Sequence, residues 1–176
     1  KALSGLSAYL SDEFVEARFD FYERTLAGNE EPRPRWKRGV ALVEGVLGEA
    51  VGRLYVERHF QPEKKAAMDE LVANLMKAYE HSIANLEWMT DETREEAQRK
   101  LSKFTPKIGY PVKWRDYSAL TLCSDDLVGN VLAANSFELD HTLSRIGRPV
   151  DRDEWQMFPQ TVNAYYHPLR NEIVFP

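Results

Sequence analysis

Apolar residues recur at spacings of three and four over most of the first hundred residues, which is the period of an amphipathic helix. The clearest stripe begins after Pro62 and predicts one long helix that buries a single face. Its apolar members are Met68, Leu71, Val72, Leu75, Met76, Tyr79, Ile83 and Leu86. Pro62 suits the first turn of this helix, because proline needs no hydrogen-bond partner there.

Further helices are predicted on both sides of this stripe. One covers residues 11–27, with Ser11 as its cap and Gly28 at its end, and a second runs from about residue 34 to 55. A helix capped by Thr90 continues to the region of residue 104. Small polar residues at helix starts and glycine at helix ends favour these limits.

The pattern changes after Pro106. Residues 107–117 contain three aromatic side chains, Tyr110, Trp114 and Tyr117, and predict an ordered, irregular connector. Ser124, with Asp125 and Asp126, is expected to cap a fifth helix that ends at Gly147.

The last sixteen residues change from the helical period to strand-forming residue types. Residues 161–166 and 173–175 predict two strands, and residues 167–170 predict the turn of a hairpin around Pro168. Asn163 is notable within this segment, since asparagine is depleted in strands and its amide both donates and accepts hydrogen bonds. An extended peptide could pair with such a strand, although the amide could equally bond to a neighbouring loop.

The helix predicted from residue 34 to 55 contains an unusual number of glycines. Each glycine in a helix interior costs about 1 kcal/mol relative to alanine. Ala41, Gly45, Gly48 and Gly52 are spaced by four, three and four residues and so share one face. We interpret this face as a packing surface for another helix, with approach of a ligand as the alternative.

Composition excludes several functional classes. The net charge of −5 and the mixed charges on the predicted helices offer no basic surface for nucleic acid. No apolar run approaches the roughly 20 residues that span a bilayer. Cys123 is the single cysteine and cannot form an internal disulfide.

The hairpin resembles a signature of the neprilysin and endothelin-converting-enzyme family of zinc metallopeptidases, which includes bacterial oligoendopeptidase O. Segments that look like the family pattern, in its order, cover nearly the whole chain. They are Pro34-Arg-Trp-Lys-Arg38, Gly52-Arg-Leu-Tyr-Val-Glu57, Leu86-Glu-Trp-Met89, Ile108-Gly-Tyr-Pro111, Val150-Asp-Arg-Asp-Glu-Trp155, Asn163-Ala-Tyr-Tyr166 and Asn171-Glu-Ile-Val-Phe-Pro176. Gly39 stands where many animal relatives carry cysteine, which predicts a bacterial source, cytoplasmic or exported.

The resemblance implies a fold, an activity and a role for two residues. The fold class is mainly α, a helical segment followed by the start of a catalytic domain with a C-terminal β-hairpin. Residues 1–105 are expected to belong to the helical domain that restricts access to the active chamber, and residues 106–176 to the linker and the first part of the catalytic domain. Asn163 and Ala164 are expected to bind the backbone of a small peptide substrate.

The resemblance also implies zinc, bound by a His-Glu-x-x-His helix and a later glutamate. Two histidines at i and i+4 share one helix face and can bind one metal ion, while the glutamate activates water. None of the four histidines of this chain falls within five residues of another. We therefore expect the catalytic and zinc-binding residues to lie beyond Pro176, and the chain to be an internal fragment that is inactive alone and binds no zinc.

Other readings of the residues remain open. The chain could be a non-catalytic helical module that binds a protein partner. It could also hold its own acid–base or metal site, for which Glu138, Asp140 and His141, or the Asp125-Asp126 pair, are candidates. Such helical metal sites need matching ligands on other helices, and no second Glu-x-x-His motif is present.

Two expectations concern the hairpin itself. His167 is expected to be a turn residue, with contact to a substrate or a metal as the alternative. Strands at residues 165–166 and 173–175 would present open edges in an isolated fragment, so self-association through these edges, or disorder, is expected. In the intact enzyme the remaining part of the catalytic domain would be the partner of this segment.

Overall fold

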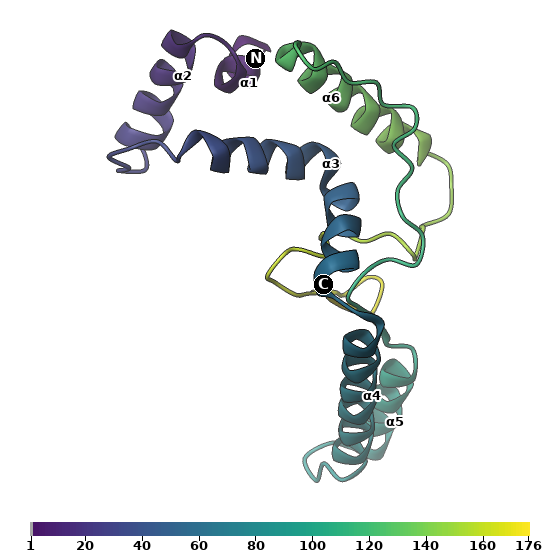
Figure 1. The fold of residues 1–176 in the computed structure, drawn as a ribbon. Coiled ribbons are helices and arrows are strands. Elements are labelled where there is room, and N and C mark those ends of the chain that lie inside the picture. Colours follow the sequence, from purple (N-terminus) through teal and green to yellow (C-terminus); the bar gives the residue numbers. More distant parts are fainter. Residues whose placement is uncertain (1) are drawn as a thin grey trace. The chain divides into compact units, whose positions relative to one another are not determined.

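The computed structural model describes residues 2–176 and is mainly helical, as predicted (Figure 1). Three short strands form one sheet in this described part of the chain. The six α-helices are α1 (Ala2–Leu6), α2 (Asp12–Arg18), α3 (Arg35–His59), α4 (Pro62–Ala84), α5 (Asp91–Ser102) and α6 (Leu127–Ser144). The strands are β1 (Thr105–Ile108), β2 (Tyr165–His167) and β3 (Glu172–Phe175).

Helices α4 and α5 confirm the clearest helical predictions. Pro62 occupies the first turn of α4, and the Thr90 side chain accepts a hydrogen bond from the Thr93 N–H at the start of α5. The two helices lie side by side (Figure 1), and Gln98 Nε2 donates to the Glu80 carbonyl oxygen at 2.7 Å.

The apolar stripe of α4 is covered only in part. Val72 is buried, whereas Leu71, Leu75 and Tyr79 are 56%, 44% and 53% exposed. The prediction of one buried stripe is therefore wrong for these three residues. About half of each of these side chains is left uncovered by the described residues.

The helix predicted for residues 11–27 begins and ends where expected, but the Ser11 side chain makes no capping hydrogen bond and the helix changes its winding. Its first part is α2, and residues Phe19–Thr25 form a π-helix in which the Leu26 N–H bonds to the Phe21 carbonyl oxygen. The Thr25 hydroxyl donates to the Asp20 carbonyl oxygen at 2.7 Å, within the same wide turn. Gly28 follows with a φ of +75°, a conformation that glycine adopts without strain.

Helix α6 is capped two residues later than predicted. Asp126, and not Ser124, accepts a hydrogen bond from the Gly129 N–H at 2.7 Å. The helix then ends before Gly147, which has a φ of +76°.

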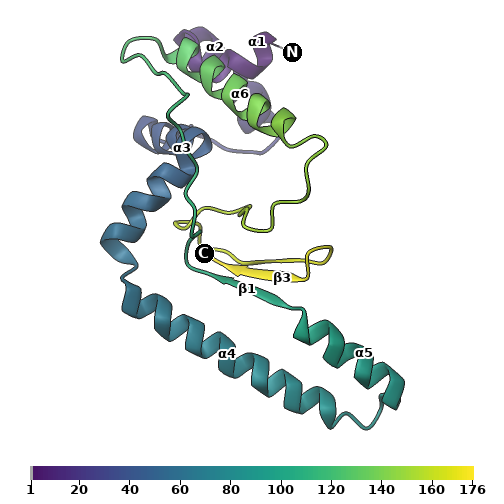
Figure 2. The ribbon, with the colours of Figure 1, turned by 90° about the vertical axis from the view of Figure 1, so that its right-hand side faces the viewer.

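The hairpin is confirmed, although its first strand begins at Tyr165 and not at residue 161 as predicted. It is part of a sheet that was not predicted from the sequence. Strands β2 and β3 pair antiparallel, and β1 pairs parallel with β3, so the order is β1-β3-β2 (Figure 2). The start of the expected irregular connector is therefore a strand. Strand β3 is enclosed on both sides and its Val174 has 0% exposure, so the expectation of an open edge at residues 173–175 is wrong.

The turn of the hairpin is held to the end of α5. Asn171 has a φ of 51°, which asparagine tolerates better than most residues, and its Nδ2 donates to the Lys100 carbonyl oxygen at 2.9 Å. The Lys100 carbonyl oxygen also accepts from the Lys103 N–H at 3.2 Å, so the Asn171 amide is a second donor to it.

The residues group into two compact units, each built from two separate stretches of the chain. One contains residues 1–47 and 116–149, and the other contains residues 48–115 and 150–176. The three-stranded sheet, α4 and α5 belong to the second unit. The assignment of residues 1–105 and 106–176 to two domains of a larger enzyme stays a prediction. None of the helices that the structure describes is long and apolar enough to cross a membrane.

Candidate functional site

Asn163 and Ala164 lie immediately before β2, in a segment without regular secondary structure that is exposed to solvent. The Asn163 N–H donates to the Thr161 carbonyl oxygen at 3.0 Å, and the Asn163 Oδ1 accepts from the Ala164 N–H at 2.8 Å. The Ala164 N–H is therefore already hydrogen-bonded to the side-chain oxygen of Asn163. A peptide that pairs with Ala164 would have to displace this bond.

Strand β2, which continues from Ala164, is an edge of the sheet. Tyr165, Tyr166 and His167 pair with Val174, Ile173 and Glu172 of β3, and no strand of residues 2–176 pairs with the outer side of β2. An edge strand offers unpaired backbone groups to an extended peptide. The geometry around Asn163 and Ala164 is thus compatible with strand addition.

Tyr165 holds the start of β2 to the loop that precedes it. Its hydroxyl oxygen accepts from the Gln156 N–H at 3.1 Å. Partial burial raises the pKa of Tyr165 above its ordinary value, because the phenolate is poorly solvated there.

A cluster of buried charges lies behind the hairpin. Lys107 Nζ of β1 contacts Glu172 Oε2 of β3 at 3.0 Å, and Arg170 Nη2 contacts Glu154 Oε2 at 3.1 Å. Arg170 Nη1 lies 3.7 Å from Glu172 Oε1. Glu172 is 1% exposed, so its charge depends on these two cations.

The charge cluster joins three segments that are distant in sequence. Lys107 Nζ also donates to the Glu154 carbonyl oxygen at 3.0 Å, and Arg152 Nη1 donates to the Arg170 carbonyl oxygen at 3.1 Å. The cluster therefore fixes the hairpin against both β1 and the loop before residue 158. Sequence reasoning missed it; the available signal was one charged residue, Glu172, at the start of the otherwise apolar strand segment that ends at Phe175.

The glycine face of α3 receives the loop that leads to Asn163. A Cβ atom built on Gly48 would lie 2.2 Å from the Phe158 ring, and one built on Gly52 would lie 2.6 Å from Pro159. Gln160 Nε2 donates to the Gly48 carbonyl oxygen at 3.1 Å. The prediction that a helix packs on this face is wrong at Gly48 and Gly52, where an irregular loop takes that place.

His167 was expected in the turn of the hairpin, but it is the last residue of β2. Its carbonyl oxygen accepts from the Arg170 N–H at 3.2 Å across the turn that follows. Its Nδ1 is buried and has no hydrogen-bond partner. A contact of His167 with a substrate or a metal stays a prediction.

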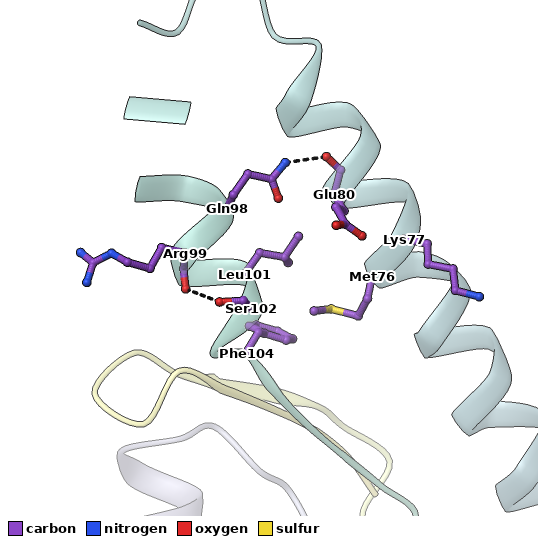
Figure 3. A pocket seen from close by; sticks show the side chains of 8 residues that line it. All are labelled: Met76, Lys77, Glu80, Gln98, Arg99, Leu101, Ser102 and Phe104. Atoms are coloured by element: carbon purple, nitrogen blue, oxygen red, sulfur yellow. Dashed lines mark hydrogen bonds between the residues drawn. The ribbon is translucent and has the colours of Figure 1, made fainter. Parts of the chain in front are cut away.

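A hollow of about 560 Å³ lies between α4 and α5 (Figure 3). Met76, Leu101 and Phe104 face one another across it, with charged and polar side chains around its rim. Phe104 also stacks on Tyr166 with a centroid distance of 6.0 Å. Neither Asn163 nor Ala164 lines this hollow.

The described residues contain no group of three or more His, Cys, Asp and Glu side chains that could hold a metal ion. Glu138, Asp140 and His141 are exposed on α6, and Asp126 is engaged in capping that helix. The residues described here therefore do not fit a zinc centre. The structure brings Asn163 and Ala164 together with a sheet edge but brings no acid–base set to them.

Comparisons with known proteins agree with the family resemblance of the sequence and with the fold described above. Residues 1–111 match the model of peptidase family M13. The whole chain is 31% identical over 183 residues to an endothelin-converting enzyme homolog of Locusta migratoria, of which it covers 25%.

Two solved structures share the fold. The zinc metalloprotease ZMP1 of Mycobacterium tuberculosis, in complex with an inhibitor, is 53% identical with a TM-score of 0.90, over 99% of this chain and 26% of that one. PepO from Lactobacillus rhamnosis is 29% identical with a TM-score of 0.89, over 98% of this chain and 28% of that one. The chain spans about a quarter of the length of these relatives. The high identity to a mycobacterial protein agrees with the bacterial source predicted from Gly39.

Proposed function

Because the chain belongs to peptidase family M13, we propose that it is part of a zinc metalloendopeptidase in which Asn163 and Ala164 hold the backbone of a peptide substrate. The observation that carries this proposal is the exposed Asn163-Ala164 segment that leads directly into an edge strand. Such an edge binds extended peptides through main-chain hydrogen bonds and needs little from the substrate side chains.

The proposed binding exchanges one internal hydrogen bond for several bonds to the substrate. The Ala164 N–H leaves Asn163 Oδ1, to which it is bonded at 2.8 Å, and donates to a substrate carbonyl oxygen. The Asn163 amide then accepts from one peptide N–H and donates to another carbonyl oxygen. The substrate is thereby aligned along the sheet before any bond is cut.

The chain supplies alignment and part of the enclosure, and other parts of the enzyme supply the chemistry. Residues 1–105 are proposed to restrict access to the active chamber, and residues 106–176 to begin the catalytic domain. Zinc is proposed to be bound by residues outside this chain, where it would polarise the scissile carbonyl and the attacking water. The isolated chain is accordingly proposed to be inactive.

The proposal is tested by replacing Asn163 in the full-length enzyme. Asn163→Ala is expected to lower kcat/KM for a short peptide. The corresponding loss of transition-state stabilisation should be about 1–3 kcal/mol, the scale of a hydrogen-bonding group lost from a site. Zinc content and thermal unfolding should be unchanged, since the Asn163 side chain is exposed.

Asn135→Ala is the matched control, because Asn135 is exposed on α6 and lies outside the proposed site. Unchanged kcat/KM for Asn163→Ala at normal zinc content would contradict the assignment. Ala164→Pro, which removes the backbone donor, should be more damaging than Ala164→Gly, which keeps it.

A further inference from the structure

The glycines of α3 fall into two groups that the sequence does not distinguish. Gly39 and Gly45 face open space, with nothing within 4 Å of a Cβ atom built on either. Gly48 and Gly52 are buried under the loop formed by residues 158–160. This loop ends three residues before Asn163.

The fit between the loop and the helix excludes any side chain at these two positions. A Cβ atom on Gly48 would meet three atoms of the Phe158 ring at 2.2–2.5 Å. A Cβ atom on Gly52 would lie 2.6 Å from Pro159 Cδ and 2.9 Å from Gln160 Oε1. Contacts below 3.0 Å require atoms to move, and the nearest atoms at each position belong to a ring rather than to the far end of a flexible side chain.

Next to this contact, α3 departs from helical geometry. Leu47 has φ −120° and ψ 27°, and the carbonyl oxygen of Gly48 accepts from Gln160 Nε2 at 3.1 Å. The loop is therefore held to α3 both by the close approach of its atoms and by a hydrogen bond.

Backbone hydrogen bonds connect the loop of residues 158–160 to the segment that contains the proposed substrate-binding residues. The Thr161 N–H donates to the Phe158 carbonyl oxygen at 2.9 Å, and the Asn163 N–H donates to the Thr161 carbonyl oxygen at 3.0 Å. From Tyr165 onward the chain is fixed by its pairing with β3. The segment that contains Asn163 and Ala164 is thus held at both ends, by the contact of residues 158–160 with α3 and by the pairing of β2 with β3.

We propose that Gly48 and Gly52 are positioning residues, which set the place of Asn163 and Ala164 by letting Phe158, Pro159 and Gln160 rest directly on the backbone of α3. The inference rests on the proposed role of Asn163 and Ala164 and adds residues that touch no substrate. A displacement of roughly 1 Å in a substrate-positioning group can lower activity by roughly a hundredfold. The glycines, costly for the helix itself, are explained by this requirement.

The test compares Gly48→Ala with Gly45→Ala in the full-length enzyme. Both changes replace a glycine of α3 close to Leu47, but only the first places a methyl group against the Phe158 ring. Gly48→Ala is expected to lower kcat/KM for a short peptide roughly ten- to a hundredfold per zinc-loaded molecule, whereas Gly45→Ala is expected to leave it unchanged. Adding Phe158→Leu to Gly48→Ala should recover part of the loss, because the smaller side chain leaves room for the methyl group.

A double-mutant cycle with Asn163→Ala separates positioning from stability. If Gly48 acts through Asn163, then Gly48→Ala should have much less effect on kcat/KM when Asn163 is already alanine. A fall in unfolding temperature with unchanged kcat/KM would show that the glycines serve packing only, and would overturn the inference. Equal losses in the presence and absence of the Asn163 side chain would overturn the part of the inference that concerns Asn163.

Failure of the inference and failure of the proposed function are distinguishable. If Asn163→Ala itself has no effect, the substrate-binding role fails, and the inference fails with it. If Asn163→Ala lowers kcat/KM and Gly48→Ala does not, only the inference fails. If Gly48→Ala does not fold, Gln160→Met replaces it, since it removes the bond to the Gly48 carbonyl oxygen without adding a clash, and it should still lower kcat/KM and couple to Asn163→Ala.

Discussion

At the scale of single residues, the most demanding feature is the charge of Glu172. Its side chain is 1% exposed and is neutralised by Lys107 at 3.0 Å and by the more distant Arg170. A buried ion pair adds little stability compared with apolar residues of the same size, but removing one member leaves a charge without a partner. The pair therefore specifies how β1 and β3 align more than it stabilises the sheet.

Replacing one member of this pair should be costly. Lys107→Met is expected to lower the free energy of unfolding by about 3 kcal/mol, because Arg170 compensates for Glu172 only in part. Denaturant unfolding followed by circular dichroism measures the change. The double variant Lys107→Met/Glu172→Leu should regain most of the loss, and a double variant as unstable as the single one would contradict this account.

The partly buried hydroxyl of Tyr165 makes the stability of the folded state vary with pH in the alkaline range. Burial raises its pKa in the folded state above the ordinary value of 10.0, so the unfolded chain loses this proton first. The stabilising contribution is therefore complete below the unfolded pKa and is lost as the pH rises through the folded pKa. Tyr165→Phe should flatten the decline of unfolding temperature above pH 10, whereas an unchanged slope would exclude Tyr165 as its source.

At the scale of elements, helix limits were the most predictable feature, and the differences have local causes. The start and cap of α5 and the first-turn proline of α4 follow from residue types within one turn. The π-helical winding after α2 and the choice of Asp126 over Ser124 depend on backbone geometry that composition does not contain.

The cap of α6 offers a direct test of this difference. Asp126→Ala should destabilise α6 by about 1 kcal/mol, because the Gly129 N–H loses its acceptor. Hydrogen exchange of the first turn of α6 measures the effect. Ser124→Ala is the matched control and should leave the exchange of that turn unchanged; an equal effect of both variants would favour the cap predicted from sequence.

At the scale of the whole molecule, the apolar face of α4 is one surface that the described contacts do not explain. Leu71, Leu75 and Tyr79 are about half exposed, although their spacing is that of a buried stripe. The chain spans only about a quarter of the length of its relatives, so the remaining part of the enzyme is the proposed partner of this face.

This proposal predicts different costs for neighbouring substitutions in the full-length enzyme. If the face is covered there, Leu71→Ser and Leu75→Ser should each destabilise it by about 2–5 kcal/mol, and Glu70→Ser by less than about 0.5 kcal/mol. Thermal unfolding with zinc content as a second readout measures both. Equal, small effects of all three variants would show that the face stays exposed.

The sequence by itself determined the helices, their approximate limits, the C-terminal hairpin and the family, because helical periods, capping residues and turn residues act within a few positions. Asn163 and Ala164 were predicted inside the first strand of that hairpin, whereas in the structure they precede β2, which begins at Tyr165. Only the tertiary structure decided that β1 pairs with β3, that buried charges join three segments, and that a loop lies on Gly48 and Gly52. These contacts join residues far apart along the chain, and no local preference for one conformation specifies which distant segments will meet.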